Sequence, residues 1–163
     1  MNEMRKGKQL TTMLYLATQR HDGQIDKGGL PYILHPLKVM HFLESSDEEL
    51  QCIALGHDII EDTFPTTEEG FRFLQSAGFS PRVVAGIFAL TKLEGEPYES
   101  YKSRVKANPD AVLVKMADLR HNLDLFRLKD VTEKDLERAA RYYRFYLEIC
   151  QVLFHAHNVG SEE

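Results

Sequence analysis

Cysteine is scarce in this sequence of 163 residues, which has only Cys52 and Cys150. The two lie far apart and form no CxxC pair, so neither a cysteine zinc site nor a dithiol redox site is indicated. No run of about 18 apolar residues could span a bilayer, and residues 1–20 lack the unbroken apolar core of a signal peptide. The sequence therefore predicts an unprocessed, cytosolic protein without a membrane partner.

A surplus of basic charge is also missing. Twenty Lys and Arg stand against 25 Asp and Glu, and the net charge is -5. Such a chain offers no broad positive field for a nucleic-acid backbone. We therefore expect no nucleic-acid partner, and any phosphate-bearing ligand must be held locally.

The alternation of apolar and polar residues that marks strands is nowhere sustained. Apolar residues instead recur at spacings of three and four, which predicts an all-α protein. The length fits one domain, 1–163, with its core at about residues 5–156 and a frayed tail at 157–163. We find no internal repeat and no linker that would divide it.

The first helix is expected over about residues 3–20, followed by a glycine-rich loop at 21–32. A second helix should start near Pro36, so that His35 lies just before it. The side chains that we expect to face inward on the first helix are Leu10, Met13, Leu14, Leu16 and Ala17.

Several later helix starts carry capping residues. Ser46 with Glu49 has the spacing of a capping box ahead of an apolar run through Ile60, and Thr66 repeats the pattern. Gly78 is placed to end the helix that Thr66 begins. Three further starts are predicted at Ser80-Pro81, at Asn108-Pro109 and at Thr132, which begins a long final helix.

An adjacent His57-Asp58 pair lies within an otherwise apolar stretch. Neither side chain can be buried cheaply without a partner, and a shared metal would satisfy both. Glu61 and Asp62 follow at a spacing of four residues, so two more carboxylates lie one helical turn further on. The alternative interpretation is that these two acids are simply exposed to solvent at a helix end.

Asp118 interrupts an apolar series in the helix expected after Pro109, and Asn122 lies one turn later on the same face. Imidazole and carboxylate ligands together suit Mn, Fe, Co or Zn better than Mg or Ca. A site of this kind leaves positions open for water and lowers the pKa of that water.

The sequence at four segments resembles the hydrolase domain of the RelA/SpoT family of alarmone enzymes, in particular its small stand-alone members. The segments are DKGGLPY at 26–32, YILHP at 32–36, GHDIIEDT at 56–63 and KMADLRHN at 115–122. They occur in the family's order, the resemblance covers about residues 10–128, and HDxxEDT is its most specific part.

The resemblance implies a compact HD-domain helical bundle that removes pyrophosphate from the 3′ position of guanosine tetra- or pentaphosphate. It implies Mn as the favoured metal, with Zn, Fe or Co also suitable, and a chain too short for a synthetase domain. Glu61 and Asp62 would orient or activate the attacking water, and Asn122 would bind nucleotide. The implied metal ligands are His35, His57, Asp58 and Asp118.

The chain departs from the family in the first loop. Asp26 stands where the family usually has an arginine placed against the purine, whereas Lys27 is retained as a candidate phosphate or ribose contact. A carboxylate there would repel phosphates, which weakens the case for guanine preference. Alternatively, another arginine such as Arg20 could take the vacant place.

Other residues are open to two interpretations. Lys115 is either a surface lysine or a charge partner that contacts substrate in the cleft, and Asn122 could instead make a structural hydrogen bond. His21 could brace the loop or touch phosphate, and we expect His121 to be an ordinary residue. The arginines at 138, 141 and 144 are more typical of a solvated face, and Tyr142 of packing.

Two other classes of function compete with alarmone hydrolysis. One is an HD phosphohydrolase that acts on an adenosine alarmone or a nucleoside monophosphate. The other is a non-catalytic nucleotide sensor, which the complete metal set and the EDT segment disfavour. The oligomeric state and protein partners are not predicted by the sequence.

Overall fold

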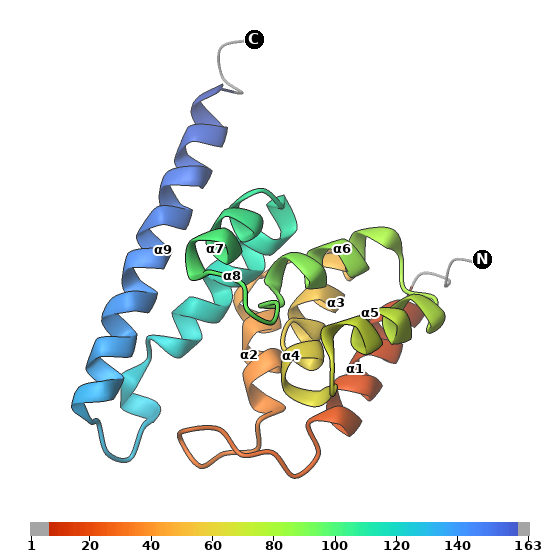
Figure 1. Cartoon of the computed structure of the whole chain (residues 1–163), viewed down its shortest axis with the longest axis horizontal. Coiled ribbons are helices and arrows are strands. Elements are labelled where there is room, and N and C mark those ends of the chain that lie inside the picture. Colours follow the sequence, from red (N-terminus) through yellow and green to blue (C-terminus); the bar gives the residue numbers. More distant parts are fainter. Residues whose placement is uncertain (1–6, 160–163) are drawn as a thin grey trace.

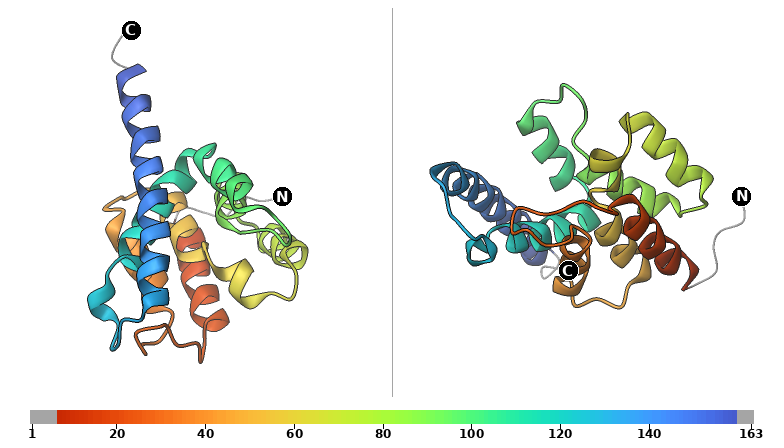
Figure 2. Two further views of the ribbon diagram at one scale, coloured as in Figure 1. Left: turned by 60° about the vertical axis from the view of Figure 1, so that its left-hand side comes forward. Right: turned by 90° about the horizontal axis from the view of Figure 1, so that it is seen from below.

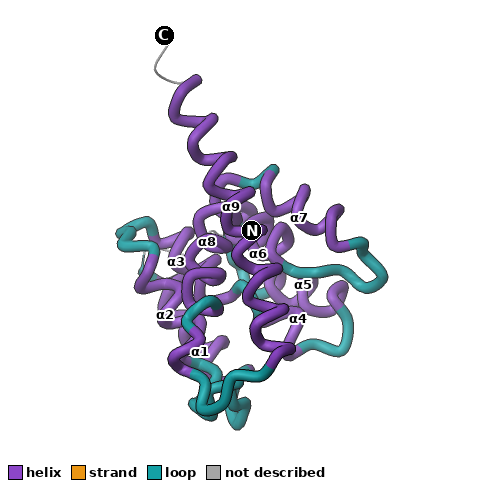
Figure 3. The backbone as a smooth tube through the Cα atoms, turned by 90° about the vertical axis from the view of Figure 1, so that its left-hand side faces the viewer, coloured by secondary structure: helices purple, strands orange, loops and turns teal. Residues whose placement is uncertain are grey.

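The computed structural model describes residues 7–159 as a bundle of helices, which confirms the predicted all-α class (Figure 1). Within those residues, helices are joined by loops and turns (Figure 3), and the nearest approach to a strand is an isolated bridge between Ile25 and Pro31. The predicted start of the first helix at residue 3 lies outside the described residues.

Residues 8–63 form the first four helices and the glycine-rich loop. The loop follows the first helix, as predicted, and His35 lies in the first turn of the second helix rather than before it. The prediction was therefore one or two residues late at Pro36. The helices are α1 (Lys8–Arg20), α2 (Leu34–Phe42), α3 (Glu48–Gly56) and α4 (Ile59–Thr63).

The predicted continuous helix through Ile60 is wrong, because the chain breaks at the His57-Asp58 pair. Asp58 has φ -104 and ψ -5, and α4 begins after it as a separate helix. The capping prediction there also needs correction, since Asp47 rather than Ser46 accepts the Glu49 and Leu50 N–H groups. The break lets His57 and Asp58 turn toward the same point, which a straight helix would not do.

The other predicted caps are confirmed. The side chains of Thr66, Ser80 and Asn108 accept backbone N–H groups at the starts of their helices. Gly78 follows the end of α5 with φ 83, a conformation that glycine adopts without strain. The helices are α5 (Thr67–Ser76), α6 (Pro81–Leu90), α7 (Tyr98–Lys106), which was not predicted, and α8 (Pro109–Asn122).

A short 3-10 turn, η1 (Leu125–Arg127), leads to the long helix α9 (Glu133–Val159). Thr132 and Asp135 cap its start reciprocally. The end of α9 projects beyond the body of the molecule (Figure 2). The helix runs to Val159, so the tail predicted to fray from residue 157 is helical as far as the structure describes it.

The core forms where α3 crosses its neighbours. Ile53 and Ile87 are fully buried, and each lies against a glycine of the other helix: a Cβ on Gly86 would be 2.4 Å from Ile53 Cδ1, and one on Gly56 2.8 Å from Ile87 Cδ1. Close contact of α3 with α6 therefore requires both glycines. Leu14, predicted to face inward, is 40% exposed, whereas Met13 and Ala17 are fully buried.

None of the helices in residues 7–159 combines the length and apolar character needed to cross a membrane.

Candidate metal centre and substrate cleft

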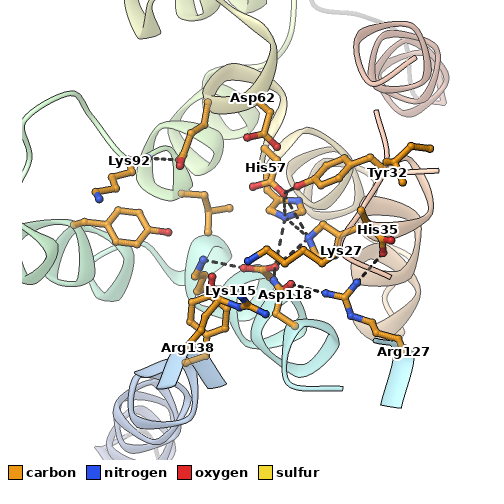
Figure 4. Close-up of a pocket in the computed structure, with 18 of the residues that line it drawn as sticks. Lys27, Tyr32, His35, His57, Asp62, Lys92, Lys115, Asp118, Arg127 and Arg138 are labelled. Atoms are coloured by element: carbon orange, nitrogen blue, oxygen red, sulfur yellow. Dashed lines mark hydrogen bonds and ion pairs between the residues drawn. The ribbon is translucent and has the colours of Figure 1, made fainter. Parts of the chain in front are cut away.

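A cleft of about 520 Å³ opens at the break between α3 and α4. The loop before α2, the helices α4 and α8, and the first turns of α9 contribute its walls (Figure 4). All nine predicted site residues line it. They are Lys27, His35, His57, Asp58, Glu61, Asp62, Lys115, Asp118 and Asn122.

His35, His57 and Asp58 bring their ligand atoms together at one end of the cleft, all within 4.8 Å of one another. His57 Nε2 lies 3.2 Å from His35 Nε2 and 2.9 Å from Asp58 Oδ2. Asp118 approaches from α8, with its Oδ1 3.1 Å from His35 Nε2 and 3.7 Å from His57 Nε2. Asp118 stands outside the group of three, on the other side of the two imidazoles.

The distances among His35, His57 and Asp58 fit a single bound cation. Metal bonds to imidazole and carboxylate of about 2.0–2.2 Å put neighbouring ligand atoms on one ion roughly 3.0–3.5 Å apart. Two imidazole nitrogens 3.2 Å apart also have no reason to face each other unless a proton or an ion lies between them. The donor set of two imidazoles and two carboxylates is therefore compatible with a divalent metal.

Each imidazole has a partner on its other nitrogen. His57 Nδ1 donates to the carbonyl of Ala54 at 2.7 Å, so in the neutral ring the lone pair is on Nε2, which faces the centre. His35 Nδ1 lies 2.6 Å from Nδ1 of His121, a residue of α8. His35, a candidate metal ligand, therefore contacts a second histidine, His121, through its other ring nitrogen.

The carboxylates have partners too. Tyr32 donates its hydroxyl to Asp58 Oδ2 at 2.6 Å. Lys115 donates to Asp118 Oδ2 at 2.8 Å, and Asn122 Nδ2 donates to Asp118 Oδ1 at 2.5 Å. Both predicted substrate contacts on α8 therefore hold a metal-ligand candidate in place, and Lys115 is a charge partner in the cleft rather than a surface lysine.

The buried charges shift one another's protonation. Burial alone would lower the pKa of His35 and His57, but the facing carboxylates outweigh it and raise both pKa values. Burial would raise the pKa of Asp58 and Asp118, but His57 for the first and Lys115 for the second hold them well below the usual range. Without a metal, the facing carboxylates therefore favour the protonated form of the imidazoles.

Glu61 and Asp62 lie on α4 at the open side of the centre. Partial burial and the charge of Asp58 raise the pKa of both acids. Glu61 Oε2 accepts the Lys92 N–H at 3.0 Å, which fixes that carboxylate against the loop after α6. Both acids line the cleft, and both remain exposed to solvent.

Three cations, Lys27, Arg127 and Arg138, line the same cleft as the ligand atoms. Lys27 reaches in from the loop, and Arg127 and Arg138 approach from η1 and α9 (Figure 4). Burial, with the positive charge of Arg138, lowers the pKa of Lys27. Such a group of cations suits a ligand that carries several negative charges.

Asp26 does not face the cleft as an isolated anion. Its Oδ1 accepts the N–H groups of Gly28 and Leu30, and its Oδ2 pairs with Arg127 at 2.7 Å. Arg127 also donates to Asn122 Oδ1 at 3.2 Å. The expected repulsion of phosphate by Asp26 is therefore offset by the guanidinium beside it.

Sequence reasoning missed several residues of the cleft. His121 was expected to be an ordinary residue, Arg138 part of a solvated face and Tyr142 a packing residue, yet His121 contacts His35 and the other two line the cleft. Arg20, the suggested substitute for the loop arginine, instead covers the ring of Phe64 at 4.0 Å. The one-turn spacing of His121 from Asp118 was a signal that could have revealed it.

No family model matches the sequence. Individual proteins do: the chain is 31% identical over 157 residues to the probable GTP pyrophosphokinase of Mycobacterium leprae, which covers 90% of this chain and 19% of that protein. It is 31% identical over 168 residues to the bifunctional (p)ppGpp synthase/hydrolase SpoT of Escherichia coli, covering 95% and 23%. The chain thus spans about a fifth of the length of these relatives.

A third relative is the guanosine-3′,5′-bis(diphosphate) 3′-pyrophosphohydrolase of Haemophilus influenzae, 34% identical over 118 residues, or 66% of this chain and 17% of that protein. The fold matches a solved structure described as a metazoan orthologue of SpoT that hydrolyses ppGpp. That match has a TM-score of 0.71 and 22% identity, and covers 90% of this chain and 87% of the other. The architecture is thus that of an HD-domain bundle.

Proposed function

Since this chain belongs to the RelA/SpoT family, we propose that it is a metal-dependent phosphohydrolase that removes the 3′-pyrophosphate from guanosine tetra- or pentaphosphate or a related alarmone. One observation carries the proposal: a cluster of imidazoles and carboxylates lies in one cleft together with Lys27, Arg127 and Arg138. The first arrangement suits a cation and the second a polyphosphate.

His35, His57, Asp58 and Asp118 would hold the metal. Mn is the expected ion, with Zn, Fe or Co as alternatives for this ligand set. When bound, the ion would lower the pKa of a water and polarise a phosphoryl oxygen.

Glu61 and Asp62 would accept the proton of the attacking water, because both lie beside the ligands and have raised pKa values. The water oxygen would bond to the phosphorus nearest the ribose, the bond from that phosphorus to the 3′ oxygen would break, and the proton taken from the water would pass to that leaving oxygen. Lys27, Arg127 and Arg138 would hold the phosphates in line for that attack. Lys115 and Asn122 would keep Asp118 oriented and could also meet substrate from the same side.

A related reaction on adenosine alarmones is the second candidate. The guanidinium of Arg127, which is nearest the loop, already donates to Asp26 and Asn122, so it has fewer donors left to read a base. Base choice therefore depends on groups that accept either purine, such as the rings of Tyr98 and Tyr142 at the cleft. The cytosolic location and the single domain stay predictions from the sequence.

The test is turnover of a panel of purified nucleotides by the purified chain with added Mn. We expect release of pyrophosphate from guanosine 3′-pyrophosphates. Release of orthophosphate instead would indicate another HD phosphohydrolase, and binding without turnover would indicate a sensor. Glu61→Gln should keep metal and substrate binding but lose turnover by roughly 100-fold or more.

A further inference from the structure

The contact between His35 and His121 is the least ordinary feature of the centre. Their Nδ1 atoms lie 2.6 Å apart, the ring planes are inclined by only 25° and the ring centroids are 4.9 Å apart. Rings that are nearly parallel and meet through their nitrogens contact each other edge to edge. The geometry is that of a hydrogen bond in the plane of the rings rather than of face-to-face stacking.

A hydrogen bond between two ring nitrogens needs one donor and one acceptor, so only one of them carries the shared proton. The other nitrogen of His35, Nε2, is the one that faces Asp118 Oδ1 at 3.1 Å and Asp58 Oδ2 at 3.4 Å. A metal ligand atom must be free of a proton. If Nε2 is to bind the ion, the proton of His35 must therefore be on Nδ1, with His121 as its acceptor.

We propose that His121 is a positioning residue that fixes the tautomer and orientation of His35 for metal binding. The proposal rests on the proposed metal site of this chain. The Nδ1 atom of His57 is held by the backbone carbonyl of Ala54, whereas Nδ1 of His35 is held by the side chain of His121. Partners of this kind are commonly carboxylates, backbone carbonyls or waters, and an imidazole does the same work only in the tautomer that leaves Nδ1 free.

Helix α8 gives this arrangement its rigidity. Asp118 and His121 are one turn apart on α8, so the same helix contacts His35 through Nε2 and through Nδ1. Asn122, the next residue, donates to Asp118. A single helix therefore supplies one proposed ligand and orients a second that belongs to α2, which couples the position of α8 to the strength of metal binding.

The matched variants are His121→Asn and His121→Leu, which have nearly the same size. Asn places an acceptor oxygen close to where His has Nδ1, whereas Leu has no acceptor. We expect the dissociation constant for Mn, measured by titration calorimetry, to increase about 10- to 100-fold in His121→Leu and by less than about 3-fold in His121→Asn. His41→Leu, which removes an exposed histidine of α2, is the control and should bind Mn like the wild type.

Spectroscopy gives a readout that a merely structural role would not change. In zinc-loaded protein labelled with ¹⁵N, a scalar coupling should connect His35 Nδ1 with His121 Nδ1 across the hydrogen bond, with the proton on His35. Equal Mn affinity in both His121 variants, or a proton on His121, would overturn the inference. Failure of the wild type to bind Mn or Zn at all would overturn the proposed metal site together with this inference, so the two failures are distinguishable.

Discussion

The carboxylate of Asp118 contacts four polar side chains, because its Oδ1 faces His35, His57 and Asn122 and its Oδ2 pairs with Lys115. We expect Asp118→Ala to lose both bound metal and activity while the helices persist. Elemental analysis and circular dichroism check this. Asp118→Asn, which keeps the shape, should lose metal as well, and a full equivalent of metal in either variant would remove Asp118 from the ligand set.

Protonation of the centre leads to a second prediction at this scale. In the metal-free protein the carboxylates raise the pKa of His35 and His57, so the folded chain keeps protons that the unfolded chain releases above a pH of about 6.5. This contribution to stability is complete below that pH and is lost as pH rises through the folded pKa values.

The melting temperature of chelator-treated protein should therefore fall as pH increases above about 6.5. With metal bound, the same imidazoles are deprotonated and the dependence should weaken or reverse, because protons compete with the ion. His41→Leu, at an exposed histidine, should leave both profiles unchanged. A flat profile for the metal-free protein would mean that the two imidazoles are not charged there.

Packing between elements decides where these residues lie. Gly86 of α6 leaves room for Ile53 of α3, and a Cβ would come within 2.4 Å of its Cδ1. Gly86→Ala should destabilise the fold by about 1–3 kcal/mol through overpacking. Because His57 directly follows α3, we expect metal affinity to decrease as well. Denaturant unfolding measures the first effect, and calorimetry with Mn the second.

The matched control for that substitution is Gly95→Ala. Its Cβ would meet nothing within 4 Å, although the backbone there has φ 71 and imposes a local strain. We expect a cost of about 1 kcal/mol and no change in metal affinity. Equal metal affinity in Gly86→Ala and the wild type would contradict this argument. It would show that α3 accommodates the added Cβ without moving His57.

Helix α9 brings Arg138 and Tyr142 to the cleft, and its docking on α7 depends on Glu148. That carboxylate pairs with Lys102 at 2.6 Å and with Lys106 at 2.9 Å. Glu148→Gln should raise KM several-fold with little change in kcat and lower stability by about 1 kcal/mol, because only the approach of α9 is loosened. Glu137→Gln, at an exposed position of α9, is the control, and a fall in kcat alone would contradict the argument.

At the scale of the whole molecule, local signals predicted much of the fold. Thr66, Ser80 and Asn108 cap the helices that the sequence assigns to them, because capping depends on a few neighbouring residues. The break at His57-Asp58 was missed, since apolar spacing continues through it. Arg138 and Tyr142 were missed because their role depends on how α9 docks, which no local pattern reports.

The glycine-rich loop joins sequence segments about a hundred residues apart, since Asp26 pairs with Arg127 and Gly28 lies so close that a Cβ would be 2.8 Å from the Arg127 carbonyl. Asp26→Arg would place two guanidinium groups together and remove the acceptor for Gly28 and Leu30. We expect KM to rise roughly 10-fold for guanosine and adenosine 3′-pyrophosphates alike. The loop that carries Lys27 would lose the hydrogen bonds and the ion pair that Asp26 makes.

The charge-swapped variant, Asp26→Arg with Arg127→Asp, distinguishes two roles for Asp26. Asp26 either holds Arg127 and the loop in place or contacts the base of the substrate. If Asp26 acts by holding Arg127 and the loop, the swap restores a large part of the lost affinity, because the two mutations are not additive across a direct contact. If Asp26 meets the base itself, the swap leaves the defect and changes the ratio of guanosine to adenosine turnover. Steady-state kinetics on both nucleotides measures the two outcomes, and a wild type that strongly prefers guanine with an unchanged Asp26→Arg would exclude any part for Asp26 in substrate binding.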